Sequence, residues 1–176
     1  MAEYIAERIT GLASYNLPAR LAREVGRIIA SWAYFEHCVQ EMNWQVLGID
    51  AAAGRIAVRE PGVADRLDML SSLINLRGGI WDVDLYKSIL ARSRILKTKR
   101  DMLAHGIWGY VEHANEWHVQ LARGSWPKNR SDLMKGSRKV IPESVLMDVE
   151  KLRQAAAEIE TLLADLKKLR ATAVSD

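Results

Sequence analysis

Apolar side chains recur at steps of three and four positions throughout residues 17–47. This spacing follows the 3.6-residue turn of an α-helix, so it predicts one long amphipathic helix over the whole range. Pro18 suits the first turn of that helix, and Gly48 suits the position just past its end. Such a helix is long for a single domain, so one side of it is a candidate surface for a partner. The apolar residues that set the period are Leu21, Val25, Ile28, Ile29, Trp32, Phe35, Val39, Met42 and Val46.

The rest of the chain predicts three more long helices. The second ends at a pair of glycines, the third is capped by an aspartate, and the last runs to about residue 170. An Ala- and Gly-rich loop at 50–54 is expected between the first two helices. The boundary signals are Pro61 and Asp65 with Gly78-Gly79 for the second helix, Asp82 or Asp84 for the third, and Pro142 with Glu143 for the last.

The segment after the third helix has a different period. Residues 107–111 and 117–121 are short, aromatic and β-branched, with five residues between them, which predicts a β-hairpin. A basic loop is expected at 124–140. The chain is therefore predicted to be an all-α protein with one domain, residues 1–176. Its architecture is a bundle of four principal helices with a β-hairpin (about 107–121) inserted before the last helix.

Positive charge is concentrated in one part of the chain. Residues 86–139 hold twelve Lys or Arg residues against four acidic residues, whereas the whole chain has a net charge of only +3. A distribution of this kind attracts phosphate backbones. It also fits a solvated basic face with no ligand, and charge alone does not separate the two interpretations.

Composition excludes several classes of protein. With 49% hydrophobic and 27% charged residues, the chain is expected to be soluble and globular. Cys38 is the single cysteine, which excludes an internal disulfide and fits a reducing cytoplasm. No apolar run approaches a membrane span, the N-terminus lacks a signal-peptide pattern, and the histidines lack metal-ligand spacing. We therefore expect a cytoplasmic protein with no membrane partner, no cofactor and no metal.

One short stretch carries the residues of a chemical site: Lys99-Arg100-Asp101-Met102-Leu103-Ala104-His105-Gly106. Glycine commonly follows a helix because it accepts a left-handed backbone conformation, so Gly106 marks the end of the third helix. Arginine keeps its charge and fits a phosphate through two hydrogen bonds. Histidine exchanges a proton near neutral pH. RNA cleavage needs these two properties, charge stabilisation at phosphorus and proton transfer at the sugar hydroxyl.

The stretch resembles the Arg-x4–6-His signature of the HEPN family of all-helical ribonucleases and RNA-binding modules. The resemblance covers about residues 17–106 and the final helix, while residues 107–140 lie outside it. It implies a metal-independent endoribonuclease, such as a toxin with an antitoxin partner or a phage-defence effector. It also implies a homodimer in which two motifs face each other in one cleft. Where the family usually has asparagine after the arginine, this chain has Asp101.

The resemblance and helix geometry together give roles to individual residues. His105 would be a general base or acid, and Arg100 would stabilise charge on the phosphoryl oxygens. Asp101, four residues before His105, would orient the imidazole. Glu36 would pair with Arg100 or lie on the flank of the first helix. In an unbroken helix Arg100 and His105 lie about 140° apart, so both meet one phosphate only if the last turn unwinds or a second copy contributes.

RNA contacts are expected next to the motif and in the basic loop. Trp108 and Tyr110 either stack on bases or belong to the core. The predicted RNA-binding residues are Lys99, Trp108, Tyr110, Lys128, Arg130, Arg138 and Lys139. Three functions remain open: a ribonuclease, a non-catalytic RNA-binding module, and a helical protein-interaction or assembly domain. In the third case Arg100 is a surface residue and His105 an ordinary residue of a helix C-terminus.

Overall fold

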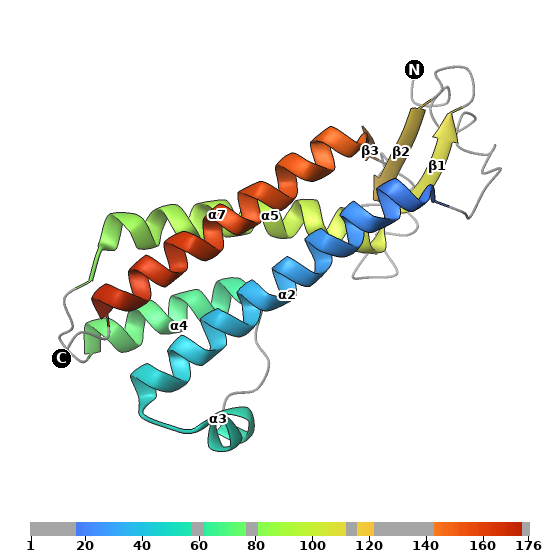
Figure 1. The fold of residues 1–176 in the computed structure, drawn as a ribbon. Coiled ribbons are helices and arrows are strands. Elements are labelled where there is room, and N and C mark those ends of the chain that lie inside the picture. Colours follow the sequence, from blue (N-terminus) through green and yellow to red (C-terminus); the bar gives the residue numbers. More distant parts are fainter. Residues whose placement is uncertain (1–16, 58–61, 77–80, 112–115, 122–142, 174–176) are drawn as a thin grey trace, which may run out of the picture. The chain divides into compact units, whose positions relative to one another are not determined.

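The computed structural model describes residues 17–57, 62–76, 81–111, 116–121 and 143–173. This part of the chain is mostly helical, with a β-hairpin before the last helix, as the sequence predicts (Figure 1). The helices are α2 (Ala19–Leu47), α3 (Ala51–Ala57), α4 (Val63–Leu76), α5 (Val83–His105) and α7 (Val149–Ala173). The strands are β1 (Ile107–Val111), β2 (Glu116–Leu121) and β3 (Glu143–Leu146).

The chain divides into two compact units. The larger unit comprises Gly26–Arg100 and Arg153–Asp176, and the smaller comprises Met1–Val25 and Asp101–Leu152. Most of α2, α5 and α7, together with α3 and α4, belongs to the larger unit. The three strands belong to the smaller unit.

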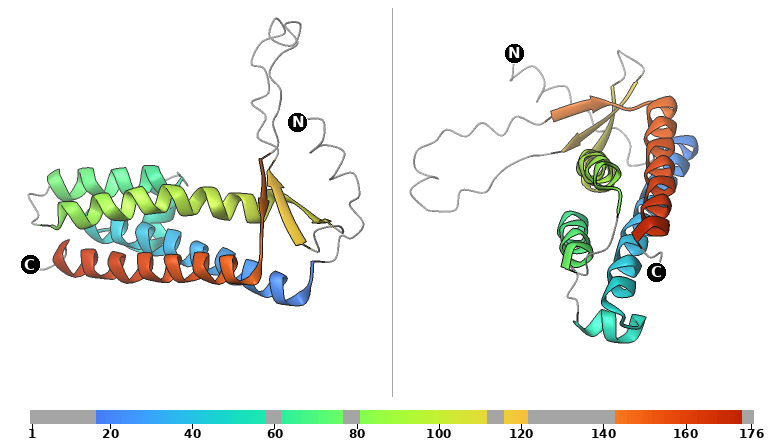
Figure 2. Two further views of the ribbon diagram at one scale, coloured as in Figure 1. Left: turned by 90° about the horizontal axis from the view of Figure 1, so that it is seen from above. Right: turned by 90° about the vertical axis from the view of Figure 1, so that its left-hand side faces the viewer.

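Four helices of the larger unit, α2, α4, α5 and α7, lie side by side as a bundle (Figure 2). Their apolar stripes meet in a core in which Trp32, Phe35, Leu67, Ile89 and Leu162 are each no more than 1% exposed. Removing such side chains from water is the main favourable term in folding. The predicted bundle of four principal helices is therefore confirmed.

Polar contacts join each neighbouring pair of helices around this bundle. The pairs are Asn43 Nδ2 to Arg66 O at 2.9 Å (α2–α4), Tyr86 Oη to Leu67 O at 3.3 Å (α4–α5), Arg92 Nη2 to Asp165 Oδ2 at 2.6 Å (α5–α7), and Arg27 with Glu160 (α2–α7).

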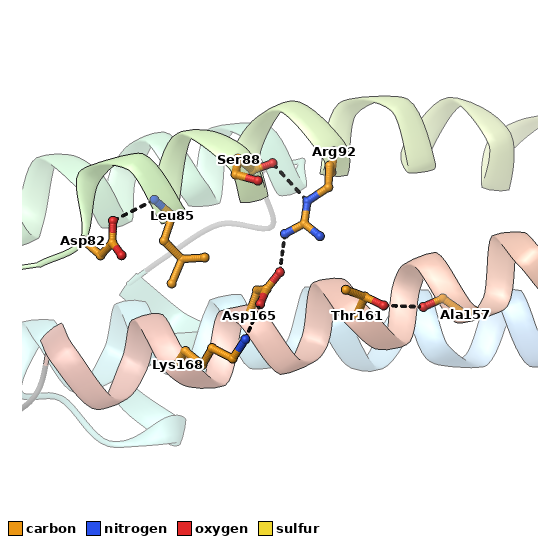
Figure 3. Close-up of polar contacts among 8 residues, drawn as sticks. All are labelled: Asp82, Leu85, Ser88, Arg92, Ala157, Thr161, Asp165 and Lys168. Atoms are coloured by element: carbon orange, nitrogen blue, oxygen red, sulfur yellow. Dashed lines mark hydrogen bonds and ion pairs between the residues drawn. The ribbon is translucent and has the colours of Figure 1, made fainter.

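Asp165 is the centre of the ionic contact between α5 and α7 (Figure 3). Its side chain is only 15% exposed and also lies 3.0 Å from the ammonium group of Lys168. Arg92 holds a second contact to α5 itself, because its Nε atom lies 3.4 Å from the carbonyl of Ser88. The hydrogen bonds from Arg92 and then Lys168 lower the pKa of the Asp165 carboxyl below its ordinary value of 3.8.

Helix α2 ends where Gly48 takes a left-handed conformation, with φ of 72°. The amide of Ile49 donates to Trp44 O at 3.1 Å, and the amide of Gly48 donates to Gln45 O at 3.0 Å. These two bonds satisfy carbonyls that the last turn of a helix leaves open, in the pattern of a Schellman motif. The predicted end of the first helix at Gly48 is confirmed.

Aspartates begin three of the helices. Asp50, Asp82 and Asp148 each accept, through Oδ1, a 2.8 Å hydrogen bond from the amide three residues further on. This bond satisfies one of the open amides of a first helical turn. Of the two predicted caps for the third helix, Asp82 is the residue that α5 uses (Figure 3).

Two of these caps correct the sequence prediction. Residues 50–54 are not a loop, because Asp50 caps a run of alanines, the residue with the highest helix propensity, and α3 begins there. The last helix does not begin at Glu143. It begins at Val149 behind the Asp148 cap, and residues 143–146 form a third strand instead.

Helix α3 packs against α2 through a glycine. A Cβ atom on Gly54 would lie 2.4 Å from Nε1 of Trp44, whose side chain is buried. No real Cβ contact is that short, so only glycine lets the α3 backbone approach the indole ring this closely.

The strands of the smaller unit form an antiparallel sheet in the order β1-β2-β3. The register pairs Tyr110 with Trp117 in the hairpin, and Leu121 with Glu143 between β2 and β3. Val119, in the central strand, is fully buried. The predicted hairpin is thus confirmed and has a third strand added to it.

Several predicted features lie outside the described residues. They are Pro61, the Gly78-Gly79 pair, Pro142 and the basic loop at 124–140. Within the described part of the chain, no helix is both long enough and apolar enough to cross a membrane.

Candidate functional site

Arg100 lies on the partly buried side of α5, where its guanidinium meets α2. Its Nη2 atom is 3.4 Å from Oε1 of Glu36, and the two side chains are 20% and 27% exposed. The guanidinium carbon also lies 5.8 Å from the centroid of the Trp32 ring, within the range of cation–π attraction. The pairing of Glu36 with Arg100 that the resemblance implied is present in the structure.

The stripe of α5 that carries Arg100 is the packing face of the helix. Leu96 and Leu103, one turn to either side of Arg100, are each 3% exposed. An arginine on such a face is stable only with a counter-ion, because a desolvated charge is costly. Glu36 supplies that counter-ion, so the arginine is held at a defined place while part of its surface stays open to solvent.

His105 is the last residue of α5 and is exposed. In the part of the chain that the structure describes, its imidazole makes no hydrogen bond or ion pair. An imidazole of this kind is accessible to a ligand and to solvent protons. Its orientation is not fixed by a neighbouring side chain.

Asp101 does not orient His105 in this structure. Asp101 is partly buried and has another partner, and no hydrogen bond between its carboxylate and the imidazole occurs among the described residues. The i,i+4 spacing permits such a bond, but a pair of this kind contributes only about 0.2–0.5 kcal/mol, so it is easily lost to another partner of Asp101.

Helix α5 ends at His105, as Gly106 predicts, but the conformation of the glycine differs from the expectation. Among the described glycines only Gly48 has a positive φ, so Gly106 is not left-handed. Its amide donates to Met102 O at 2.8 Å, which continues the helical bonding pattern. Trp108 then supplies the cap, because its Nε1 atom donates to Leu103 O at 3.2 Å.

The two aromatic residues expected to contact RNA are held in the small sheet and its helix junction. The indole N–H of Trp108 donates to a carbonyl at the end of α5, which favours a packing role for its ring. Tyr110 packs against Trp117 of the neighbouring strand, with ring centroids 5.4 Å apart. Both residues are half-buried.

The basic residues expected to contact RNA divide into two groups. Lys99 lies on α5 and pairs with Glu158 of α7, with 2.8 Å between Nζ and Oε2, while its side chain remains 43% exposed. The remaining predicted contacts, Lys128, Arg130, Arg138 and Lys139, lie outside the described residues.

Helix α5 runs without interruption from Val83 to His105. Unwinding of its last turn is therefore not how Arg100 and His105 meet one phosphate. In a continuous α-helix, residues five apart lie about 140° apart around the axis and ~7.5 Å apart along it. The other arrangement that the sequence left open, a contribution from a second copy, stays a prediction.

One neighbour of this site was not recognised in the sequence. Arg66 of α4 donates a hydrogen bond from Nη1 to the main-chain oxygen of Glu36 at 3.3 Å. The available signal was its position beside the apolar stripe of α4, where Val63, Leu67 and Leu70 are all buried. A cation so close to a packing face needs an acceptor on the neighbouring helix.

Comparison with family models, curated proteins and solved structures finds no match to this chain. Within the described residues, no group of three or more His, Cys, Asp or Glu side chains is arranged to hold a metal ion. The site is therefore characterised by its own geometry: a fixed arginine paired with a glutamate, and an exposed histidine at the end of the same helix.

Proposed function

We propose that this chain is a metal-independent endoribonuclease of the HEPN type, acting on single-stranded RNA. The observation that carries the proposal is the ion pair between Arg100 and Glu36. It places the arginine of the Arg-x4–6-His motif against an acid of the first long helix, as the resemblance implies. The Arg100 side chain remains 20% exposed, so the ion pair is not sealed from solvent.

In the proposed reaction, His105 removes the proton from a ribose 2′-hydroxyl as that oxygen attacks the adjacent phosphorus. The bond from phosphorus to the 5′-oxygen of the next nucleotide breaks, and a protonated imidazole or water returns a proton to that oxygen. Arg100 stabilises the negative charge that builds on the phosphoryl oxygens, which is worth several kcal/mol in a site that excludes water. The products are a 2′,3′-cyclic phosphate and a free 5′-hydroxyl.

The proposed site is composite. Because α5 is continuous through His105, Arg100 and His105 of one chain diverge around the helix axis. A two-fold dimer that brings the ends of two α5 helices together would let the arginine of one copy and the histidine of the other meet one phosphate. An antitoxin that covers this dimer cleft would be the natural inhibitor of such an enzyme.

A non-catalytic RNA-binding module is the second candidate. It is favoured by the His105 imidazole, which has no orienting hydrogen bond among the described residues. A general base is usually held in place by a third group. The same cleft would then bind the RNA backbone without cleaving it.

Incubation of the purified chain with single-stranded RNA in excess EDTA distinguishes these candidates. Cleavage that leaves 2′,3′-cyclic phosphate ends is the expected result, because the proposed chemistry uses only side chains. A gel shift without cleavage would favour the RNA-binding module. Neither shift nor cleavage would leave the helical interaction domain as the remaining function.

A further inference from the structure

A second guanidinium reaches Glu36 from a third helix. Arg66 lies in the first turn of α4 and donates to the main-chain oxygen of Glu36 at 3.3 Å. Arg100 comes from α5 and lies 3.4 Å from the carboxylate of the same residue. Two cations on different helices therefore converge on one residue of α2.

Arg66 is not neutralised by an acid in the described part of the chain. The one hydrogen bond that its guanidinium makes there goes to an uncharged carbonyl, and its buried Nε atom has no partner. A partly buried guanidinium without a nearby carboxylate lowers the stability of the fold, because its charge is desolvated and has no counter-ion. That cost falls when an anion binds beside it, because the charge then has a counter-ion.

The position of Arg66 is fixed by the packing of α4 on α2. Asn43 is only 1% exposed and donates from Nδ2 to Arg66 O at 2.9 Å. The same amide group lies 3.1 Å from Val39 O, within its own helix. The backbone of the first turn of α4 is thus tied to α2, and the bond from Nη1 to Glu36 O places the guanidinium beside the same helix.

We propose that Arg66 binds a phosphate of the RNA backbone next to the phosphate that Arg100 holds. This inference rests on the proposed function and adds a residue to the same site. Arginine suits the role because its planar group forms two parallel hydrogen bonds to a phosphate and keeps its charge at every working pH. Glu36 contacts both cations, Arg100 through its carboxylate and Arg66 through its main-chain oxygen, so both guanidinium groups lie beside one residue of α2.

The test measures RNA binding by the full chain carrying His105→Ala, in which the RNA is not consumed. A short, unstructured, labelled RNA is titrated at several salt concentrations, with and without Arg66→Gln. Removing one phosphate contact should weaken binding about tenfold at low salt. It should also reduce the slope of log affinity against log salt by about 0.7, the value for one contact to a single strand.

Arg55→Gln is the matched control. Arg55 is an exposed arginine of α3, so its loss removes the same charge at a different place and should leave the slope nearly unchanged. Equal slopes for the Arg66→Gln and Arg55→Gln proteins would overturn the proposal. Circular dichroism of each variant establishes that the helices are retained.

Labelling of the wild-type chain with an arginine-specific reagent tests the same contact without a substitution. RNA should protect Arg66 and leave Arg55 reactive, as measured by mass spectrometry. Equal labelling of Arg66 with and without RNA would overturn the proposal, whether or not Arg66→Gln folds.

Failure of this proposal is distinguishable from failure of the proposed function. If the wild type cleaves RNA and Arg66→Gln keeps the salt slope, the role of Arg66 is overturned and the ribonuclease stands. If RNA binding depends on Arg66 but wild type never cleaves, the phosphate contact stands and the ribonuclease is overturned. If inorganic phosphate protects Arg66 from labelling and RNA does not, the assignment to an RNA backbone is overturned.

Discussion

Arg100 and His105 differ in how firmly they are held. Arg100 is fixed by a carboxylate and lies near the face of a buried indole, whereas His105 is exposed at a helix end. The sequence could predict the first arrangement, because an arginine on the Leu96 and Leu103 stripe requires a counter-ion. It could not predict the missing Asp101 contact, because a weak exposed pair depends on competing partners and not on spacing alone.

Substitution of either motif residue should abolish RNA cleavage while the protein stays folded. In the proposed reaction, Arg100→Ala removes the charge that stabilises the transition state, and His105→Ala removes proton transfer, which alone should cost at least about a hundredfold in rate. Initial rates of cleavage and thermal melting of each variant are the measurements.

Two matched controls accompany these variants. Arg94→Ala removes an exposed arginine of α5, and His37→Ala removes an exposed histidine that lies 3.2 Å from Glu41. Both should cleave RNA at nearly the wild-type rate. Full activity of Arg100→Ala or His105→Ala would show that the motif has only a structural role.

Helix ends were predictable where a single residue decides them. Gly48 and Asp82 act as expected because left-handed glycine and an aspartate N-cap are local effects. The short helix α3 and strand β3 were missed for a different reason. Helix α3 has a cap at Asp50 but is too short for a periodic pattern, and β3 depends on pairing with β2, which the sequence does not specify.

Two glycine-to-alanine substitutions should change stability in opposite directions. Gly54→Ala places a Cβ atom 2.4 Å from the Trp44 indole nitrogen, so it should destabilise the fold by about 1–3 kcal/mol. Gly26→Ala lies in the interior of α2, where a Cβ meets nothing within 4 Å, and should stabilise by about 0.5–1 kcal/mol. Thermal melting should separate the two by several degrees. A stabilising Gly54→Ala would mean that α3 does not pack closely on Trp44.

The contact between α5 and α7 should weaken in acid. The pKa of Asp165 is lowered in the folded state, so its contribution to stability is complete above the ordinary value of 3.8 and is lost as the pH falls through the lowered pKa. Asp165→Asn should therefore cost about 1–2 kcal/mol at neutral pH and progressively less in strong acid. Denaturant unfolding at several pH values measures the difference.

Asp84→Asn is the control for this experiment. Asp84 is 97% exposed and lies 3.9 Å from Lys87, so its substitution should have little effect at any pH. A stability difference between wild type and Asp165→Asn that does not change with pH would contradict the ion-pair explanation.

The proposed composite site makes a prediction about assembly. Because α5 is continuous through His105, the proposed ribonuclease would need a second copy to bring an arginine and a histidine to one phosphate. Light scattering should give a mass near twice the 19.8 kDa of the chain. A mixture of the inactive Arg100→Ala and His105→Ala proteins should regain part of the activity, because mixed dimers contain one intact arginine–histidine pair.

A strict monomer at micromolar concentration, or no recovery on mixing, would contradict the composite site. The sequence alone did not decide how Arg100 and His105 would meet one phosphate, because it allowed either an unwound helix end or a second copy. The structure removes the first of these, since the amide of Gly106 continues the helical bonds of α5.

The pairing of Leu121 with Glu143 determines where the chain can be altered without changing the sheet. Residues that face each other in an antiparallel ladder lie about 4.5–5.5 Å apart at Cα, a distance that a short turn spans. The chain between them therefore leaves and re-enters the sheet at adjacent positions. Its length and sequence can change, or a two-residue turn can replace it, while the strands on either side keep their register. The connection from β2 to β3 is thus the position at which a peptide can be inserted, or the chain shortened, with least effect on the sheet.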